Sequence, residues 1–245
     1  MMKVKWWRCK TPFFRKVTYT EHSRTLFIYN FGCNWACSVC TYRIRDPCSV
    51  EKCREISENE IMKLVEEYYL NGKAKTVKFL GGEPLINPNL PTIAEFAMDL
   101  GLSVSIGHTN LSLMPPEGVE GVVAGIKAIS EDIHREYTGN FTNEEALENF
   151  ERCYQKGITL KTNTVLVPKF VDVDEVERIA EFIASIDDNI PFHIIGYMPV
   201  PNFPWRRPTI NELKTAAATA KKHLKNVTWS RPSIEEISYP SKRIL

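Results

Sequence analysis

The chain has 245 residues, 43% of them hydrophobic, and a formal net charge of +1. A chain of this length can bury a sizeable core as one α/β domain or as two smaller ones. The balanced charge gives no long-range field that would favour nucleic acid or a membrane surface. No run approaches the ~20 apolar residues of a membrane-spanning helix, and the N-terminus lacks the apolar region of a signal peptide. We therefore expect a cytoplasmic protein.

The predicted elements alternate between strands and helices along most of the chain. Residues 1–23 are basic and aromatic without clear periodicity, and 24–31 (RTLFIYNF) predict the first buried strand. Ser57 and Glu60 form a capping box that predicts a helix start, and Gly157 is typical of a helix end. Further strands are predicted at 76–80, 102–106, within 118–129, at 158–167 and at 192–197. Further helices are predicted at 90–100, 143–156, 173–186 and 208–224.

This alternation is typical of βαβ units and a parallel sheet. Six such units fit a partial (β/α)6 barrel better than an eight-fold barrel, which needs ~250 residues for the barrel alone. We expect an N-terminal extension at 1–23, the partial barrel at 24–225 and a polar tail at 226–245. Functional loops are expected at the carboxyl ends of the strands.

Three cysteines follow the first predicted strand: Cys33, Cys37 and Cys40 have the spacing C-x3-C-x2-C. Thiolates are the ligands of iron–sulfur clusters, and three of them leave one iron of a 4Fe–4S cluster without a protein ligand. The spacing alone also allows a zinc site completed by Cys48 or Cys53, or part of a disulfide framework in a secreted protein.

A second motif, Gly81-Gly82-Glu83-Pro84, stands at the end of the predicted strand 76–80. The cysteine spacing and this motif together resemble the radical SAM superfamily. The resemblance implies that the open iron chelates S-adenosylmethionine (SAM) through its amino and carboxylate groups, and that the GGEP segment contacts the methionyl amine. We expect any side chain at Gly82 to clash with that ligand or to distort the turn. The implied fold is a partial (β/α)6 radical SAM barrel.

Later segments resemble one branch, the glycyl-radical-enzyme activating enzymes such as pyruvate formate-lyase activating enzyme. They are 126–127, 131–139, 165–168 and 194–197. Three positions depart from that branch: Gly125 stands in place of an Asp, His108 in place of an acidic residue before Thr-Asn, and Met198 in place of a His. Because of these departures, the branch's contacts to the SAM ribose and to a cation cannot be copied across.

The resemblance and the strand ends together give a set of candidate residues. The cluster ligands are expected to be Cys33, Cys37 and Cys40. The expected cofactor-binding residues are Tyr42, Gly81, Gly82, Glu83, Pro84, His108, Asn110, Lys127, Asn163 and Tyr197. Of these, Tyr42 either contacts the adenine or packs on the barrel rim, and His108 could equally be a loop histidine bonded to backbone.

Several residues outside these motifs have open interpretations. Cys9, Cys48 and Cys53 could form an auxiliary cluster or metal site, form a disulfide or remain free thiols, whereas Cys153 is expected in the core. Aromatic residues are expected near the barrel mouth at Trp6, Trp7 and Trp205. The Arg206-Arg207 pair could bind an anion or simply cap the rim.

The sequence thus predicts a radical SAM enzyme with a 4Fe–4S cluster, SAM and an external reductant of the ferredoxin or flavodoxin type. It would cleave SAM to a 5′-deoxyadenosyl radical that takes a hydrogen from a small-molecule substrate. The missing Asp at Gly125 favours this interpretation. Length and helix pattern favour the alternative, an enzyme that makes a glycyl radical on a partner protein. A zinc- or cluster-binding scaffold is the non-enzymatic alternative. Nucleic-acid and membrane partners are not expected.

Overall fold

The computed structural model describes residues 12–45, 54–233 and 241–245. Its centre is one nine-stranded sheet in the order β8-β7-β6-β5-β4-β3-β2-β1-β9. The six predicted strands are all present, as β2 (Thr25–Phe31), β3 (Thr76–Leu80), β4 (Ser103–Thr109), β5 (Gly121–Gly125), β6 (Thr159–Leu166) and β7 (Phe192–Gly196). They pair in parallel in chain order. The expected parallel α/β architecture is confirmed.

The sheet extends beyond these six strands at both edges. β8 (Val227–Ser230) pairs in parallel with β7, β1 (Phe13–Thr20) is antiparallel to β2, and β9 (Lys242–Arg243) is antiparallel to β1. Phe13–Thr20, within the expected N-terminal extension, thus forms part of the sheet. The alternation of buried and exposed side chains that predicts a strand is interrupted there. A register shift lies between Phe14 and Lys16, and Arg15 is buried as well as Phe14.

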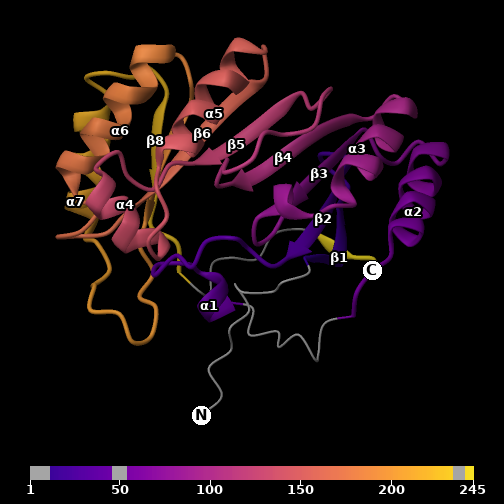
Figure 1. Ribbon diagram of the computed structural model, residues 1–245, viewed down its shortest axis with the longest axis horizontal. Coiled ribbons are helices and arrows are strands. Elements are labelled where there is room, and N and C mark those ends of the chain that lie inside the picture. The colour runs from indigo at the N-terminus through magenta and orange to yellow at the C-terminus, as the bar shows by residue number, and fades with distance from the viewer. Residues whose placement is uncertain (1–11, 46–53, 234–240) are drawn as a thin grey trace.

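Helices cover one face of the sheet (Figure 1). They are α2 (Glu58–Leu70), α3 (Leu90–Asp99), α5 (Glu144–Gln155), α6 (Val173–Ile186) and α7 (Ile210–Ala220). The shorter α1 (Tyr42–Arg45), η3 (Pro84–Ile86) and α4 (Glu131–Thr138) lie in the connections between strands and these helices. The capping box of Ser57 and Glu60 is present at the start of α2, as predicted. Inside the described ranges, the helices fall short of the length and hydrophobicity that a membrane span requires.

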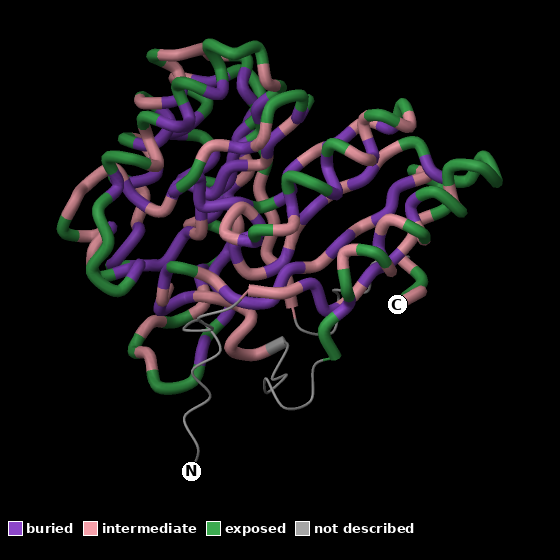
Figure 2. The backbone as a smooth tube through the Cα atoms, turned by 45° about the vertical axis from the view of Figure 1, so that its right-hand side comes forward, coloured by how far each residue is buried: buried purple, intermediate pink, exposed green. Residues whose placement is uncertain are grey.

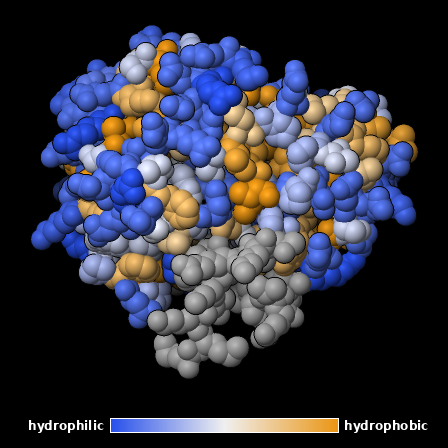
Figure 3. Space-filling model, in the orientation of Figure 1, coloured by the Kyte–Doolittle hydropathy of each residue, from blue (hydrophilic) through white to orange (hydrophobic). Residues whose placement is uncertain are grey.

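The core lies between the sheet and the helices. Alternate strand residues such as Ile28, Phe79 and Ile106 are fully buried there, and Cys153 of α5 joins them as expected. The residues between them face the opposite side of the sheet, so buried and less buried positions alternate along the strands (Figure 2). The sheet curves but does not close. Figure 3 shows that hydrophilic side chains cover most of the described outer surface in that view, with apolar groups gathered near its middle.

Candidate active site

The three motif cysteines lie on the loop that follows β2. In the described structure all three are free thiols of intermediate burial. The loop is fixed to the C-terminal end of α4, because Ala36 N donates to Thr138 O (2.9 Å) and Ser38 N donates to Tyr137 O (2.9 Å). From the other side, the Arg43 guanidinium donates to the carbonyls of Ala36 and Cys37, both at 3.0 Å. The cysteines therefore stand on a loop held from two directions.

The charges around the loop fit an iron–sulfur cluster. Burial raises the pKa of all three thiols, that of Cys37 to about 12, and neighbouring thiolates raise the pKa of Cys33 and Cys37 further. Lys127 and Arg43 act in the opposite direction on Cys37 and Cys40. A metal must displace the thiol protons, and these two cations offset the negative charge that results.

The cysteines would hold such a cluster as three separate ligands. Across the described part of the chain, no group of three His, Cys, Asp or Glu side chains is placed to hold one metal ion. A cuboidal cluster does not need such a group, because each thiolate binds a different iron. The donor set and its cationic neighbours are therefore those that a three-cysteine cluster requires.

The two motif glycines bring the end of β3 against the start of the cysteine loop. Gly81 and Gly82 have φ of +85° and +47°, and a Cβ at Gly82 would overlap the carbonyl of Gly32. A Cβ at Gly81 would come within 2.7 Å of Asn30 O. Glu83 N donates to Gly32 O at 2.9 Å. The sequence predicts close approach of this backbone to a ligand, and the structure shows its close approach to the cluster loop.

The Glu83 side chain joins β3 to the end of β4. Its buried carboxylate accepts from the Thr109 hydroxyl (2.7 Å), Asn110 N (2.6 Å) and Leu85 N (3.0 Å). Burial raises the pKa of Glu83, while these hydrogen bonds favour its ionised form. Because its oxygens are engaged, a cofactor would meet this segment through backbone atoms. Pro84 follows as the first residue of η3.

Asn110 is bonded to the cysteine loop. Its amide nitrogen donates to Asn34 Oδ1 (2.9 Å), and its own Oδ1 accepts from Ser112 N and Oγ. Asn34 in turn donates to Ser112 Oγ at 2.7 Å. Sequence reasoning missed Asn34 and Ser112, although the place of Asn34 inside the cysteine motif was a signal. The end of β4 thus supports the cluster loop as a third anchor.

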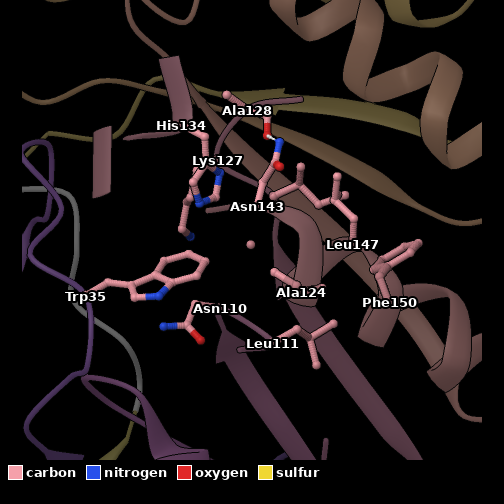
Figure 4. A pocket seen from close by; sticks show the side chains of 13 residues that line it. Trp35, Asn110, Leu111, Ala124, Lys127, Ala128, His134, Asn143, Leu147 and Phe150 are labelled. Atoms are coloured by element: carbon pink, nitrogen blue, oxygen red, sulfur yellow. Dashed lines mark hydrogen bonds between the residues drawn. The ribbon is translucent and has the colours of Figure 1, made fainter. Parts of the chain in front are cut away.

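Lys127 occupies the space that Gly125 leaves empty. A Cβ at Gly125 would overlap the Lys127 ammonium, so the absent Asp at this position makes room for the lysine. The side chain points towards Trp35 of the cysteine loop (Figure 4). Over the described residues it has no hydrogen bond or ion pair. An unpaired ammonium beside Cys37 and Cys40 can receive an anionic group of a ligand.

His108 and Asn163 lie together on the barrel side of the sheet. Asn163 Nδ2 is 3.2 Å from His108 Nδ1, and His108 has a φ of +58° that turns the end of β4. His108 is exposed on the barrel side of the sheet. Partial desolvation by the surrounding strands, together with the charge of Lys127, lowers its pKa to about 4. The imidazole is therefore neutral at pH 7 and can accept the amide hydrogen of Asn163.

The two candidate tyrosines lie on either side of the cysteine loop. Tyr197 is buried, and its hydroxyl accepts from Val200 N at 2.8 Å, so it packs in the protein interior. Tyr42 begins α1, where the Arg15 guanidinium lies 5.8 Å from its ring centroid. Tyr197 thus packs beside the cysteine loop and Tyr42 directly follows it, and a cofactor contact of either ring stays a prediction.

A stack of aromatic rings belongs to the hydrophobic cluster that packs around Val39 and Cys37 of the cysteine loop. Ring centroids are 6.1 Å apart for Tyr137 and Phe170, 4.4 Å for Phe170 and Trp205, and 5.6 Å for Trp205 and Phe203. The arginines that follow are engaged, because Arg206 donates to Glu212 and Arg207 donates to backbone carbonyls. The structure therefore favours the capping interpretation of that arginine pair.

His134 of α4 lines a small cavity with Trp35, Lys127 and Asn143 (Figure 4). Its ring packs edge-on against Trp35, with centroids 5.1 Å apart. The imidazole is 2% exposed and lies beside the Ala128 backbone. Burial lowers its pKa to about 4, although a hydrogen bond with the Ala128 backbone acts to raise the pKa of the ring. Sequence reasoning included His134 only as part of the 131–139 segment and gave it no role.

Five residues with open interpretations, Cys9, Cys48, Cys53, Trp6 and Trp7, lie outside the described residues.

An open parallel α/β barrel with three cysteines after its first parallel strand and GGEP after the second defines a class of protein. The model of the radical SAM superfamily matches residues 27–183, and the chain belongs to that superfamily. Its members use a 4Fe–4S cluster and SAM, so these are the cofactors of this chain. The zinc-site and disulfide interpretations of the motif cysteines are set aside by this assignment.

Among named proteins, the chain is 27% identical over 222 residues to a Methanocaldococcus jannaschii protein provisionally named a glycyl-radical enzyme activating enzyme. That match covers 87% of this chain and 84% of the relative. A GTP 3′,8-cyclase of Trichodesmium erythraeum is 24% identical over 182 residues, covering 69% of this chain and 55% of the cyclase.

Among solved structures, SuiB of Streptococcus suis superposes with a TM-score of 0.61 at 14% identity. The superposition covers 85% of this chain but only 48% of SuiB. The chain thus spans about half the length of SuiB and of the cyclase, and most of the archaeal relative. At this identity, the likeness to SuiB shows the fold alone.

Proposed function

We propose that this radical SAM enzyme abstracts a hydrogen atom from a small-molecule substrate held inside the open barrel. When bound and reduced, the cluster supplies the electron for the cleavage of SAM. The observation that carries the proposal is the joining of three strand ends, those of β2, β3 and β4, through Gly32, Glu83 and Asn110. This network holds the cysteine loop in one position relative to the barrel interior.

The residues of the site have distinct tasks in this proposal. Cys33, Cys37 and Cys40 hold the cluster, and Arg43 fixes their loop and offsets its charge. The Lys127 ammonium, unpaired in the described structure, would receive the SAM carboxylate. His108 and Asn163, at the strand ends, would hydrogen-bond the ribose hydroxyls. The GGEP segment would accept from the methionyl amine through its backbone carbonyls.

Two observations support a small substrate. The stack of Tyr137, Phe170, Trp205 and Phe203 packs beside the cysteine loop, and in this proposal it limits the room for an incoming protein loop. The relative named GTP 3′,8-cyclase carries the name of a small-molecule reaction and matches 69% of this chain. Both are consistent with a substrate enclosed in the barrel.

The second candidate is an activating enzyme that makes a glycyl radical on a partner protein. The archaeal relative favours it, because the match extends over 87% of this chain and 84% of that protein. Against it stand the same departures noted in the sequence, Gly125 and His108, at positions that line the site. In either case the reductant is expected to be of the ferredoxin or flavodoxin type, and the cytoplasmic location stays a prediction.

The experiment uses the anaerobically reconstituted full chain with SAM and dithionite. Formation of 5′-deoxyadenosine is expected, and its rate should rise when a cell extract filtered to small molecules is added. A protein that binds iron but never forms 5′-deoxyadenosine would contradict the enzymatic proposal. Incubation with a glycyl-radical protein gives the other arm: a glycyl signal by electron paramagnetic resonance would favour the second candidate.

A further inference from the structure

The barrel side of the sheet carries lysines for which the cofactor site gives no task. Lys78 lies on β3 between Val77 and Phe79, and Lys161 lies on β6 beside Leu160. Val77, Phe79 and Leu160 are buried in the core against the helices. Because strand side chains alternate between the two faces, Lys78 and Lys161 project to the opposite side, into the open barrel.

The two lysines belong to a group that crosses the barrel. The Lys78 side chain lies over β4, where a Cβ built on Gly107 would come within 3.1 Å of Lys78 Cδ. On β6, Asn163 is two residues beyond Lys161 and therefore on the same face; its amide bonds His108 of β4 at 3.2 Å. The lysines thus flank the His108–Asn163 pair on the side away from the cysteine loop.

The charges in this group are of one sign. Burial lowers the pKa of Lys78, and Lys161 lowers it further. The charged neighbours that lower the pKa of His108 are Lys127, Lys78 and His193. No carboxylate acts on either residue in this way. Within the described ranges, neither Lys78 nor Lys161 has an ion pair or hydrogen bond.

A neighbouring hydroxyl group also lacks a hydrogen-bond partner among the described residues. Ser105 is the register partner of Lys78 on β4, and its buried Oγ has no hydrogen-bond partner among the residues described. Lys78 is half-buried and Lys161 is exposed on the barrel side; the repulsion between their ammonium groups is unfavourable, and so is the unpaired buried hydroxyl. An anion with several acceptor oxygens would relieve both at once.

We propose that Lys78 and Lys161 bind the anionic group of the substrate, a phosphate or a carboxylate. This inference rests on the proposed function and deepens it by giving the substrate class. The anion would sit deeper in the barrel than the cysteine loop, and the rest of the substrate would extend past His108 and Asn163 towards the cluster. Lys127, nearer the cysteines, would remain for the cofactor.

The test is calorimetric titration of the cluster-containing full chain, without SAM, with inorganic pyrophosphate, with citrate and with neutral ribose at constant ionic strength. We expect one of the two anions to bind and ribose not to bind. Stronger binding of pyrophosphate would identify a phosphorylated substrate, and stronger binding of citrate a polycarboxylate. Lys78→Met and Lys161→Met should each weaken binding at least tenfold, whereas Lys78→Arg should weaken it less than threefold.

Lys63→Met is the matched control, because Lys63 is an exposed lysine on the outer helix α2. Equal weakening by this control, or no weakening by Lys78→Met and Lys161→Met, would show an adventitious ion only and overturn the proposal. The absorbance of the cluster checks that each variant is folded. Because anion binding is measured without SAM, its failure is distinguishable from a failure of SAM cleavage.

Discussion

Gly82 is the residue at which an added side chain would collide most directly with the first turn of the cysteine loop. With a φ of +47° and a Cβ that would overlap Gly32 O, Gly82→Ala is expected to shift the loop and to lower the iron bound after reconstitution by at least half. Gly72→Ala is the control, because Gly72 has a φ of +62° but no atom within 4 Å of an added Cβ. Equal iron content in the two variants would contradict this role for Gly82.

The cysteines themselves give the second prediction at this scale. Reconstitution should give about four irons per chain. Cys37→Ala should abolish 5′-deoxyadenosine formation, because a cluster with two thiolates left is poorly held. Cys153→Ala is the matched control, since Cys153 is buried in the core away from the loop. Full cleavage activity in Cys37→Ala would remove Cys37 from the set of ligands.

Single-residue roles could be predicted from the sequence only where spacing decides them. The three cysteines and the two glycines were found in this way, since each motif lies within one short segment. The roles of Glu83, Asn110 and Tyr197 could not be derived, because their partners come from other strands. Polar and aromatic residues at strand ends suit a ligand and a neighbouring loop equally well, and only the packing of the strands selects between them.

At the scale of elements, periodicity gave the six central strands and the main helices, and missed those with an irregular pattern. β1 contains a register shift, and buries Arg15 along with Phe14. β9 has only two residues and is defined by its pairing with β1. The helix α4 was not predicted, because its eight residues have low mean hydropathy and bury His134, Tyr137 and Thr138.

The start of α4 depends on Glu175 of α6. The Glu175 carboxylate accepts from Ile129 N (2.5 Å), Ser130 N (2.8 Å) and Ser130 Oγ (2.6 Å). Glu175→Gln should reduce the free energy of unfolding by about 1–3 kcal/mol, the range for a buried hydrogen-bonding group that loses its partner. Because α4 anchors the cysteine loop, the variant should also lose iron faster. Urea denaturation of the two proteins measures the first effect.

The pH dependence of this contribution follows from the pKa of Glu175. Burial acts to raise that pKa, but the hydrogen bonds from Ser130, Ile129 and Arg178 outweigh it and lower the pKa. A carboxyl with a lowered folded-state pKa stabilises the protein above its unfolded value, and this stabilisation is lost as pH falls through the folded-state value. The difference between wild type and Glu175→Gln should therefore shrink below about pH 4.3, the reference value for Glu. A difference that is constant down to pH 3 would contradict this.

At the scale of the whole molecule, the cluster loop is a junction between distant parts of the chain. It is bonded to the end of α4 through Tyr137 and Thr138, and to the ends of β3 and β4 through Gly32 and Asn34. A bound cluster would fix all of these contacts at once, because binding to the folded state alone stabilises that state. Removing the cluster by chelation should thus lower the melting temperature of the full chain by at least ~2 °C, which at this size corresponds to about 1 kcal/mol. The same treatment of Cys37→Ala should change nothing, and an equal shift in both proteins would place the effect of the chelator elsewhere.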